Sequence, residues 1–219
     1  MNHLDKEKII ERTKEYVYSE LHNEGSGHDW YHIVRVTNLA KTIASKERAD
    51  LYICELAALL HDIADEKLNS SESEALQKVR HWINSVGVDR TTAQQVISII
   101  STMSFKGGNQ PEMTTLEGKV VQDADRLDAI GAIGIARTFA YAGSKGDLIY
   151  DPALKPRETM TKEQYRNGKS TAINHFYEKL LKLKETMNTT YGKQLAEERH
   201  RIMERYLQDF FNEWENDCP

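Results

Sequence analysis

Apolar residues recur every three to four positions along almost the whole chain, a spacing typical of one buried face of an α-helix. The strict alternation of apolar and polar residues that marks a half-buried strand is not convincing anywhere in the sequence. The pattern therefore predicts an all-α helical bundle. The expected helices cover residues 5–21, 29–45, 50–65, 69–86, 90–102, 116–142, 170–187 and 190–215.

Glycines and one long charged segment interrupt this series of helices. Gly87 follows the fourth helix in the position of a C-terminal cap, and Gly131 or Gly134 is expected to kink the helix over 116–142. Residues 144–169 are charged, contain prolines and show little periodicity, and loops of this length are often functional lids. We expect a single domain over residues 1–219, in which 144–169 form a lid and two helices over 170–215 close the chain.

Composition narrows the possible functions. The apolar share of 39% and the charged share of 29% are typical of a soluble globular protein. The net charge of −5 leaves no broad basic surface for nucleic acid. No apolar run approaches the roughly 20 residues of a membrane helix, and residues 1–20 lack the apolar stretch of a secretory signal. Cys54 and Cys218 provide neither a disulfide framework nor a zinc ribbon. We expect a cytoplasmic protein without nucleic-acid or membrane partners.

Four ionisable side chains fall on apolar or small-residue helix faces, where an unpaired charge is costly. His61 and Asp62 lie inside an apolar run, and His32 shares the apolar face of the second helix. Asp125 lies on a face of small residues, whereas Asp123 points to the far side of the same helix. Two imidazoles and two carboxylates suit a divalent transition ion better than Ca²⁺. The alternative for any one of them is a hydrogen-bonded core residue, but four on matching faces favour a metal site.

The order of these four residues resembles the HD-domain superfamily of metal-dependent phosphohydrolases, and their context resembles its small stand-alone bacterial branch. The resemblance covers about residues 25–145 and is carried by the segments GHDWYH (27–32), LHDIAD (60–65) and QDADRLDA (122–129). It implies one divalent metal ion held by His32, His61, Asp62 and Asp125. Mn²⁺ is the first choice, and Fe²⁺, Co²⁺, Ni²⁺, Zn²⁺ and Mg²⁺ are the alternatives.

The resemblance also implies catalytic roles for Asp65 and His28. Asp65 stands one turn after Asp62, where related nucleotidases carry a carboxylate that transfers protons, often a longer Glu. The alternative is a surface carboxylate at a helix end. His28, one turn before His32, is either a hydrogen-bonding partner of a phosphate or ligand, or a plain helix residue.

Further residues are candidates for substrate binding, each with a solvated charge or a salt bridge as the plainer alternative. Cations would hold the phosphates, tyrosines would stack on a base, and Asp128 would orient a ligand or a sugar hydroxyl. These candidates are Lys67, Asp128, Arg35, Lys106, Tyr141, Tyr150, Lys155 and Arg157.

The resemblance implies hydrolysis of a nucleotide by attack of a metal-bound water. It favours a nucleoside triphosphate pyrophosphohydrolase, which releases a monophosphate and pyrophosphate. A 5′-nucleotidase acting on monophosphates is the alternative, and a non-catalytic ligand-sensing module is the alternative of another class. A homodimer is also open, because some apolar positions of the terminal helices suit either a core or a dimer face: Phe176, Leu180, Leu207, Phe210 and Phe211.

Overall fold

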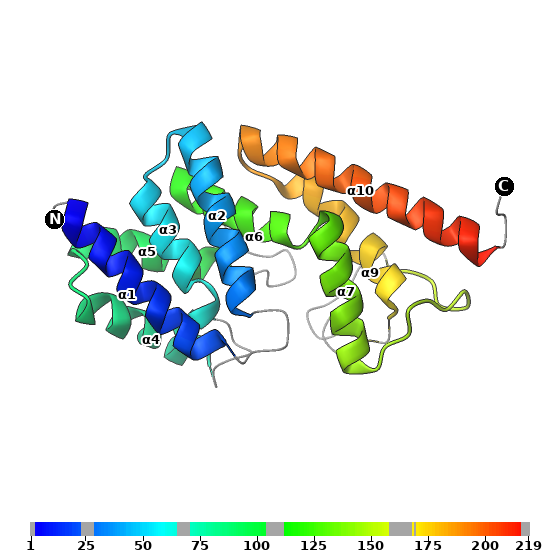
Figure 1. Ribbon diagram of the computed structural model, residues 1–219, viewed down its shortest axis with the longest axis horizontal. Coiled ribbons are helices and arrows are strands. Elements are labelled where there is room, and N and C mark those ends of the chain that lie inside the picture. The colour runs from blue at the N-terminus through cyan, green and yellow to red at the C-terminus, as the bar shows by residue number, and fades with distance from the viewer. Residues whose placement is uncertain are drawn as a thin grey trace. The chain divides into compact units, whose positions relative to one another are not determined.

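The computed structural model describes residues 3–22, 29–64, 71–103, 112–157, 168 and 170–215. Every regular element among these residues is a helix, so the predicted all-α fold is confirmed (Figure 1). The helices are α1 (His3–Leu21), α2 (Trp30–Glu47), α3 (Leu51–Leu60), η1 (Asp62–Ala64), α4 (Glu72–Ser85), α5 (Arg90–Met103), α6 (Leu116–Asp128), α7 (Gly131–Lys145), α9 (Ala172–Glu178), η2 (Leu180–Thr186) and α10 (Thr190–Trp214).

Capping side chains set the starts of the helices that carry the candidate site. The Asp29 carboxylate accepts the backbone N–H of His32 at 2.7 Å and so begins α2. Asp50 begins α3 in the same way. Helix α4 starts at Glu72, three residues later than the sequence pattern predicts, and the Ser71 hydroxyl caps it. Gly87 follows α4 with φ +78°, which confirms its predicted place at the helix end.

The long helix expected over 116–142 is divided into α6 and α7. Gly131 has φ +76°, a conformation that residues with a side chain rarely adopt. At Gly134 a Cβ atom would lie 2.2 Å from the Ala129 carbonyl oxygen, so only glycine allows this close approach. Both glycines that the sequence suggested as kink sites therefore shape the same connection, and the kink is a complete break.

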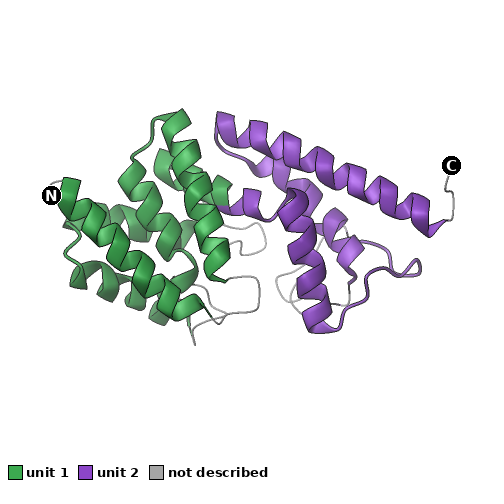
Figure 2. Cartoon of the chain, viewed as in Figure 1, with its two compact units in different colours: residues 1–124 green, residues 125–219 purple. Residues whose placement is uncertain are grey.

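The chain forms two compact units, residues 1–124 and 125–219 (Figure 2). In the first unit α3 packs against α1, α2 and α5 and is buried along its length. Cys54 lies in this core, and burial, with smaller effects of Glu117 and Asp50, raises the pKa of its thiol to about 12. Helix α6 runs through the boundary between the units, and the expected single domain stays a prediction.

In the second unit α10 packs against α7 and η2, and α9 packs against α7. Phe176, Leu180 and Leu207 are buried in this core, so these three positions serve the fold of one chain. Phe210 and Phe211 are half-buried. The homodimer stays a prediction. Among the described residues, none of the helices is both long and apolar enough to cross a membrane.

Candidate metal centre

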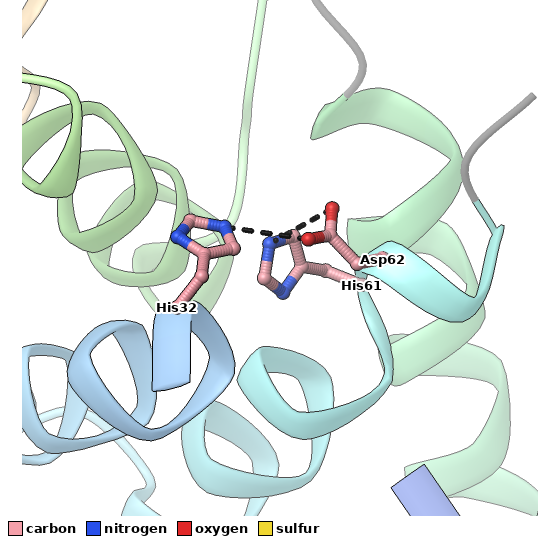
Figure 3. Close-up of side chains that lie close together, drawn as sticks. All are labelled: His32, His61 and Asp62. Atoms are coloured by element: carbon pink, nitrogen blue, oxygen red, sulfur yellow. Dashed lines mark ion pairs between the residues drawn. The ribbon is translucent and has the colours of Figure 1, made fainter. Parts of the chain in front are cut away.

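His32, His61 and Asp62, three of the four residues proposed as ligands from the sequence, lie close together in the first unit (Figure 3). His32 stands in the first turn of α2, His61 follows the last residue of α3, and Asp62 opens η1. The switch from α3 to the short 3-10 helix turns the two adjacent side chains toward one point. The end of one apolar helix and the start of another thus form the centre.

The distances between the donor atoms fit a shared cation. His32 Nε2 lies 3.3 Å from Asp62 Oδ2, and His61 Nε2 lies 3.3 Å from Asp62 Oδ1. One donor atom from each residue lies within 4.8 Å of the other two. Two ligand atoms about 2.1 Å from one ion are about 3.0 Å apart at a right angle and about 3.4 Å apart in a tetrahedron. The observed separations agree with both geometries.

A second hydrogen bond of His61 fixes which ring nitrogen is available. His61 Nδ1 lies 2.7 Å from the Ala58 carbonyl oxygen, one of the carbonyls left without a helical partner at the end of α3. Because a carbonyl only accepts, Nδ1 carries the proton, and in the neutral ring Nε2 then carries a lone pair. A histidine held in this tautomer is typical of metal sites.

The burial of the three residues favours a positive charge beside the Asp62 carboxylate. His32 is 1% exposed, Asp62 is 4% exposed and His61 is 9% exposed. A buried carboxylate needs a compensating positive charge, either on a protonated imidazole or on a bound ion. The donor set, the tautomer of His61 and the distances all fit a divalent metal ion, in agreement with the predicted chemistry.

Asp125 lies on α6, half-buried, at the first position of the second unit. Its role as the fourth ligand stays a prediction. The neighbouring Asp123 has no exposed surface, although the helical projection turned it away from the predicted site. The sequence contained a signal for this burial, because the neighbouring residues Val120, Val121 and Ala124 are apolar. The structure buries all three. Asp123 is thus a buried acidic residue to which sequence reasoning gave no role.

Several predicted substrate-binding residues are held by other side chains within the second unit. Arg137 pairs with the Asp128 carboxylate at 2.6 Å, which is the salt bridge considered as the alternative for Asp128. Arg157 binds both carboxylate oxygens of Glu178, through Nε at 2.9 Å and Nη2 at 2.7 Å. The Ser170 hydroxyl donates to the same carboxylate at 3.0 Å. Glu178 therefore binds both Arg157 and Ser170, the residues on either side of 158–169.

The two predicted tyrosines have different surroundings. Tyr150 meets α10 edge-on, with ring centroids 5.9, 5.4 and 5.0 Å from those of Phe210, Phe211 and Trp214. Tyr141 is exposed on α7, with the Lys145 ammonium 5.7 Å from its ring centroid. Lys155 is exposed and Arg35 is half-buried. The predicted roles of His28, Asp65, Lys67 and Lys106 fall outside the described residues.

Two cavities in the described part of the first unit are lined by other residues than the cluster. One of about 510 Å³ lies between α1 and the turn after α4, and includes Lys8, Arg12 and Asp89. The other, of about 440 Å³, lies between α4 and α5 and includes Arg80 and Arg90. The buried histidine–aspartate cluster thus remains the candidate centre that the sequence singled out.

Comparison with known proteins identifies the class. The HD-domain family model matches residues 29–130, a range that contains the cluster and Asp125. A Bacillus subtilis protein, the uncharacterized protein YpgQ, is 42% identical over 214 residues, which are 97% of this chain and 95% of that protein. The chain belongs to the HD-domain superfamily and is a metal-dependent phosphohydrolase.

Solved structures of relatives agree with this assignment. An HD-superfamily hydrolase of Bacillus thuringiensis is 47% identical, with a TM-score of 0.77 over 96% of this chain and 98% of that one. A protein of Lactobacillus plantarum is 44% identical, with a TM-score of 0.84 over the same shares. The B. subtilis YpgQ was crystallised in complex with ADP; that chain is 41% identical, with a TM-score of 0.74 and coverage of 96% and 98%.

Proposed function

We propose that the protein is a nucleoside triphosphate pyrophosphohydrolase, which converts an NTP or dNTP to its monophosphate and pyrophosphate. The observation that carries the proposal is the buried His32–His61–Asp62 cluster, whose donor atoms and His61 tautomer suit a divalent ion. The ADP complex of the related YpgQ supports a nucleotide as the substrate.

The ion would be held by His32, His61, Asp62 and Asp125, with Mn²⁺ as the first choice. When bound, it would supply Lewis-acid polarisation of a phosphate oxygen and lower the pKa of a coordinated water. Asp62 would balance part of the charge of the ion, and the Ala58 carbonyl would keep His61 in the binding tautomer. Asp65 would accept or return the proton of the attacking water.

The phosphate chain of the relative's ligand favours pyrophosphohydrolysis over the alternative 5′-nucleotidase. ADP carries two phosphates, and a site that holds it in YpgQ accommodates more than a monophosphate. Exposed cations such as Lys155 would add charge for a longer phosphate chain. The non-catalytic alternative would bind the same nucleotides without turnover.

One assay tests the proposal. Metal-stripped protein is resupplied separately with Mn²⁺, Co²⁺, Ni²⁺, Zn²⁺ or Mg²⁺, incubated with a panel of nucleoside mono- and triphosphates, and the products are separated by ion exchange. Monophosphate with pyrophosphate from a triphosphate is the expected result. Orthophosphate from monophosphates alone would replace the proposal with the nucleotidase, and nucleotide binding without any product would replace it with the sensing module.

A further inference from the structure

Arginines from two other helices hold the C-terminal end of α6. The Leu127 carbonyl accepts a hydrogen bond from the Arg199 guanidinium of α10 and a second one from the backbone N–H of Ile130 at 3.2 Å. The Asp128 carbonyl accepts from Arg137 of α7 at 3.3 Å, and Arg137 also pairs with the Asp128 carboxylate, which is almost fully buried. Carbonyls at a helix end lack partners within the helix, and positive charge is favourable there. The last turn of α6 is therefore fixed by contacts from outside it.

The aliphatic part of Arg199 also packs on the break between α6 and α7. A Cβ atom at Gly131 would lie 2.9 Å from Arg199 Cγ and 3.0 Å from Arg199 Cβ, so the stem of the arginine lies directly on this glycine. Its guanidinium is partly desolvated, and burial lowers its pKa while Asp128 opposes this shift. A partly buried charged donor of this kind forms strong, well-oriented hydrogen bonds.

Asp125 stands two residues before Leu127, in the same final turn of α6. The last turn of a helix frays unless its carbonyls are held. Fraying of this turn would move the Asp125 carboxylate. We propose that Arg199 is a positioning residue for Asp125, so that α10 sets the metal affinity of the site. This inference rests on the proposed function, in which Asp125 is the fourth ligand.

Three arginine variants of the full chain test the inference. Arg199→Met keeps an apolar stem over Gly131 and removes the donors, whereas Arg199→Lys keeps a charged donor group on a single nitrogen. Arg201→Met is the matched control, because Arg201 is exposed on the same helix and its Nε donates to the Glu197 carbonyl of that helix, at 3.4 Å. The first readout is the Mn²⁺ affinity of the metal-stripped protein, from the electron paramagnetic resonance signal of free Mn²⁺. The second is the melting temperature without metal.

Removal of a group that orients a ligand lowers metal affinity by about 10- to 100-fold, and we expect this loss for Arg199→Met. Arg199→Lys should lose less, and Arg201→Met should bind within about twofold of wild type. If Arg199→Met does not fold, the Lys variant carries the comparison. A lower melting temperature with unchanged Mn²⁺ affinity in both Arg199 variants would overturn the inference, since Arg199 would then serve only the fold.

A double variant separates positioning from a general structural effect. If Arg199 acts through Asp125, Arg199→Met should change the affinity less than twofold in an Asp125→Asn background. The same fold-change in both backgrounds would overturn the inference. Wild-type affinity in the Asp125→Asn single variant would remove Asp125 as fourth ligand from the proposed function, and the inference would fall with it. Weak binding in Asp125→Asn together with wild-type affinity in Arg199→Met would overturn the inference and leave the proposed function intact.

Discussion

The hydrogen bond between His61 Nδ1 and the Ala58 carbonyl, at 2.7 Å, determines what the cluster can bind. It keeps the proton on Nδ1, so the neutral ring presents a lone pair at Nε2 toward Asp62, 3.3 Å away. A lone pair and a carboxylate oxygen repel at this distance unless a proton or a metal ion lies between them. At neutral pH and in the presence of a transition ion, the metal is the better partner for this donor set.

His61→Ala and Asp62→Asn should each lower bound Mn²⁺ by about 100-fold or more and abolish turnover, because each removes a ligand of the proposed site. The measurements are metal content after dialysis, by plasma mass spectrometry, and product formation from triphosphates. His81→Ala is the matched control, since His81 is exposed on α4. Retention of wild-type metal content in both cluster variants would place the ion elsewhere.

Much of the candidate site could be predicted from single residues, since burial on an apolar helix face marks His32, His61 and Asp62 without knowledge of their partners. Arg157 and Tyr150 show why the remainder could not. A cation in a charged segment suggests phosphate binding, but its partner Glu178 lies 21 residues later and only folding brings the two together. The aromatic partners of Tyr150 lie on α10, still farther along the chain.

At the scale of elements, glycine marked the break between α6 and α7 in the sequence, but its severity depends on packing. Gly131 and Gly146 have almost the same backbone conformation, with φ +76° and +73°. An added Cβ at Gly146 would meet no atom within 4 Å, whereas at Gly131 it would meet the stem of Arg199. Sequence reasoning could find the glycine, but not the helix that passes over it.

We expect Gly146→Ala to cost about 1 kcal/mol, the strain of a left-handed residue with a side chain. Gly131→Ala should cost at least about 1 kcal/mol more, because it adds an overlap with Arg199. The free energy of unfolding in urea measures both. Equal losses in the two variants would show that the contact with Arg199 relaxes freely.

Helix α9 carries a histidine that should make the stability of the second unit depend on pH. Burial lowers the pKa of His175 from its ordinary 6.5 to about 4, with Lys179 and Arg157 acting in the same direction and Glu178 against it. The unfolded chain therefore binds a proton between these two values that the folded chain does not. Stability from this residue is complete above about pH 6.5, falls as the pH decreases toward 4 and is constant below that.

The expected loss over that window is about 3 kcal/mol for His175 alone. Urea unfolding of the wild type and of His175→Gln at several values between pH 7.5 and 4.5 isolates this contribution as the difference between the two curves. The variant should lose less stability on acidification. Parallel curves would show that His175 titrates alike in the folded and unfolded chain.

For the whole molecule, the cluster places a buried carboxylate between two imidazoles, and a bound cation would offset part of the electrostatic cost of that arrangement. A ligand that binds only the folded chain stabilises it by about 2.7 kcal/mol at a concentration one hundred times its Kd. For a chain of 219 residues, this energy raises the melting temperature by roughly 5–10 °C.

We expect this increase in melting temperature when Mn²⁺ is added to metal-stripped protein, and its reversal by a chelator. His61→Ala should show no such increase, measured by the same thermal unfolding. A shift of equal size in His61→Ala would mean that the stabilising ion binds outside the cluster, because the histidine removed is the residue whose tautomer the end of α3 fixes for metal binding.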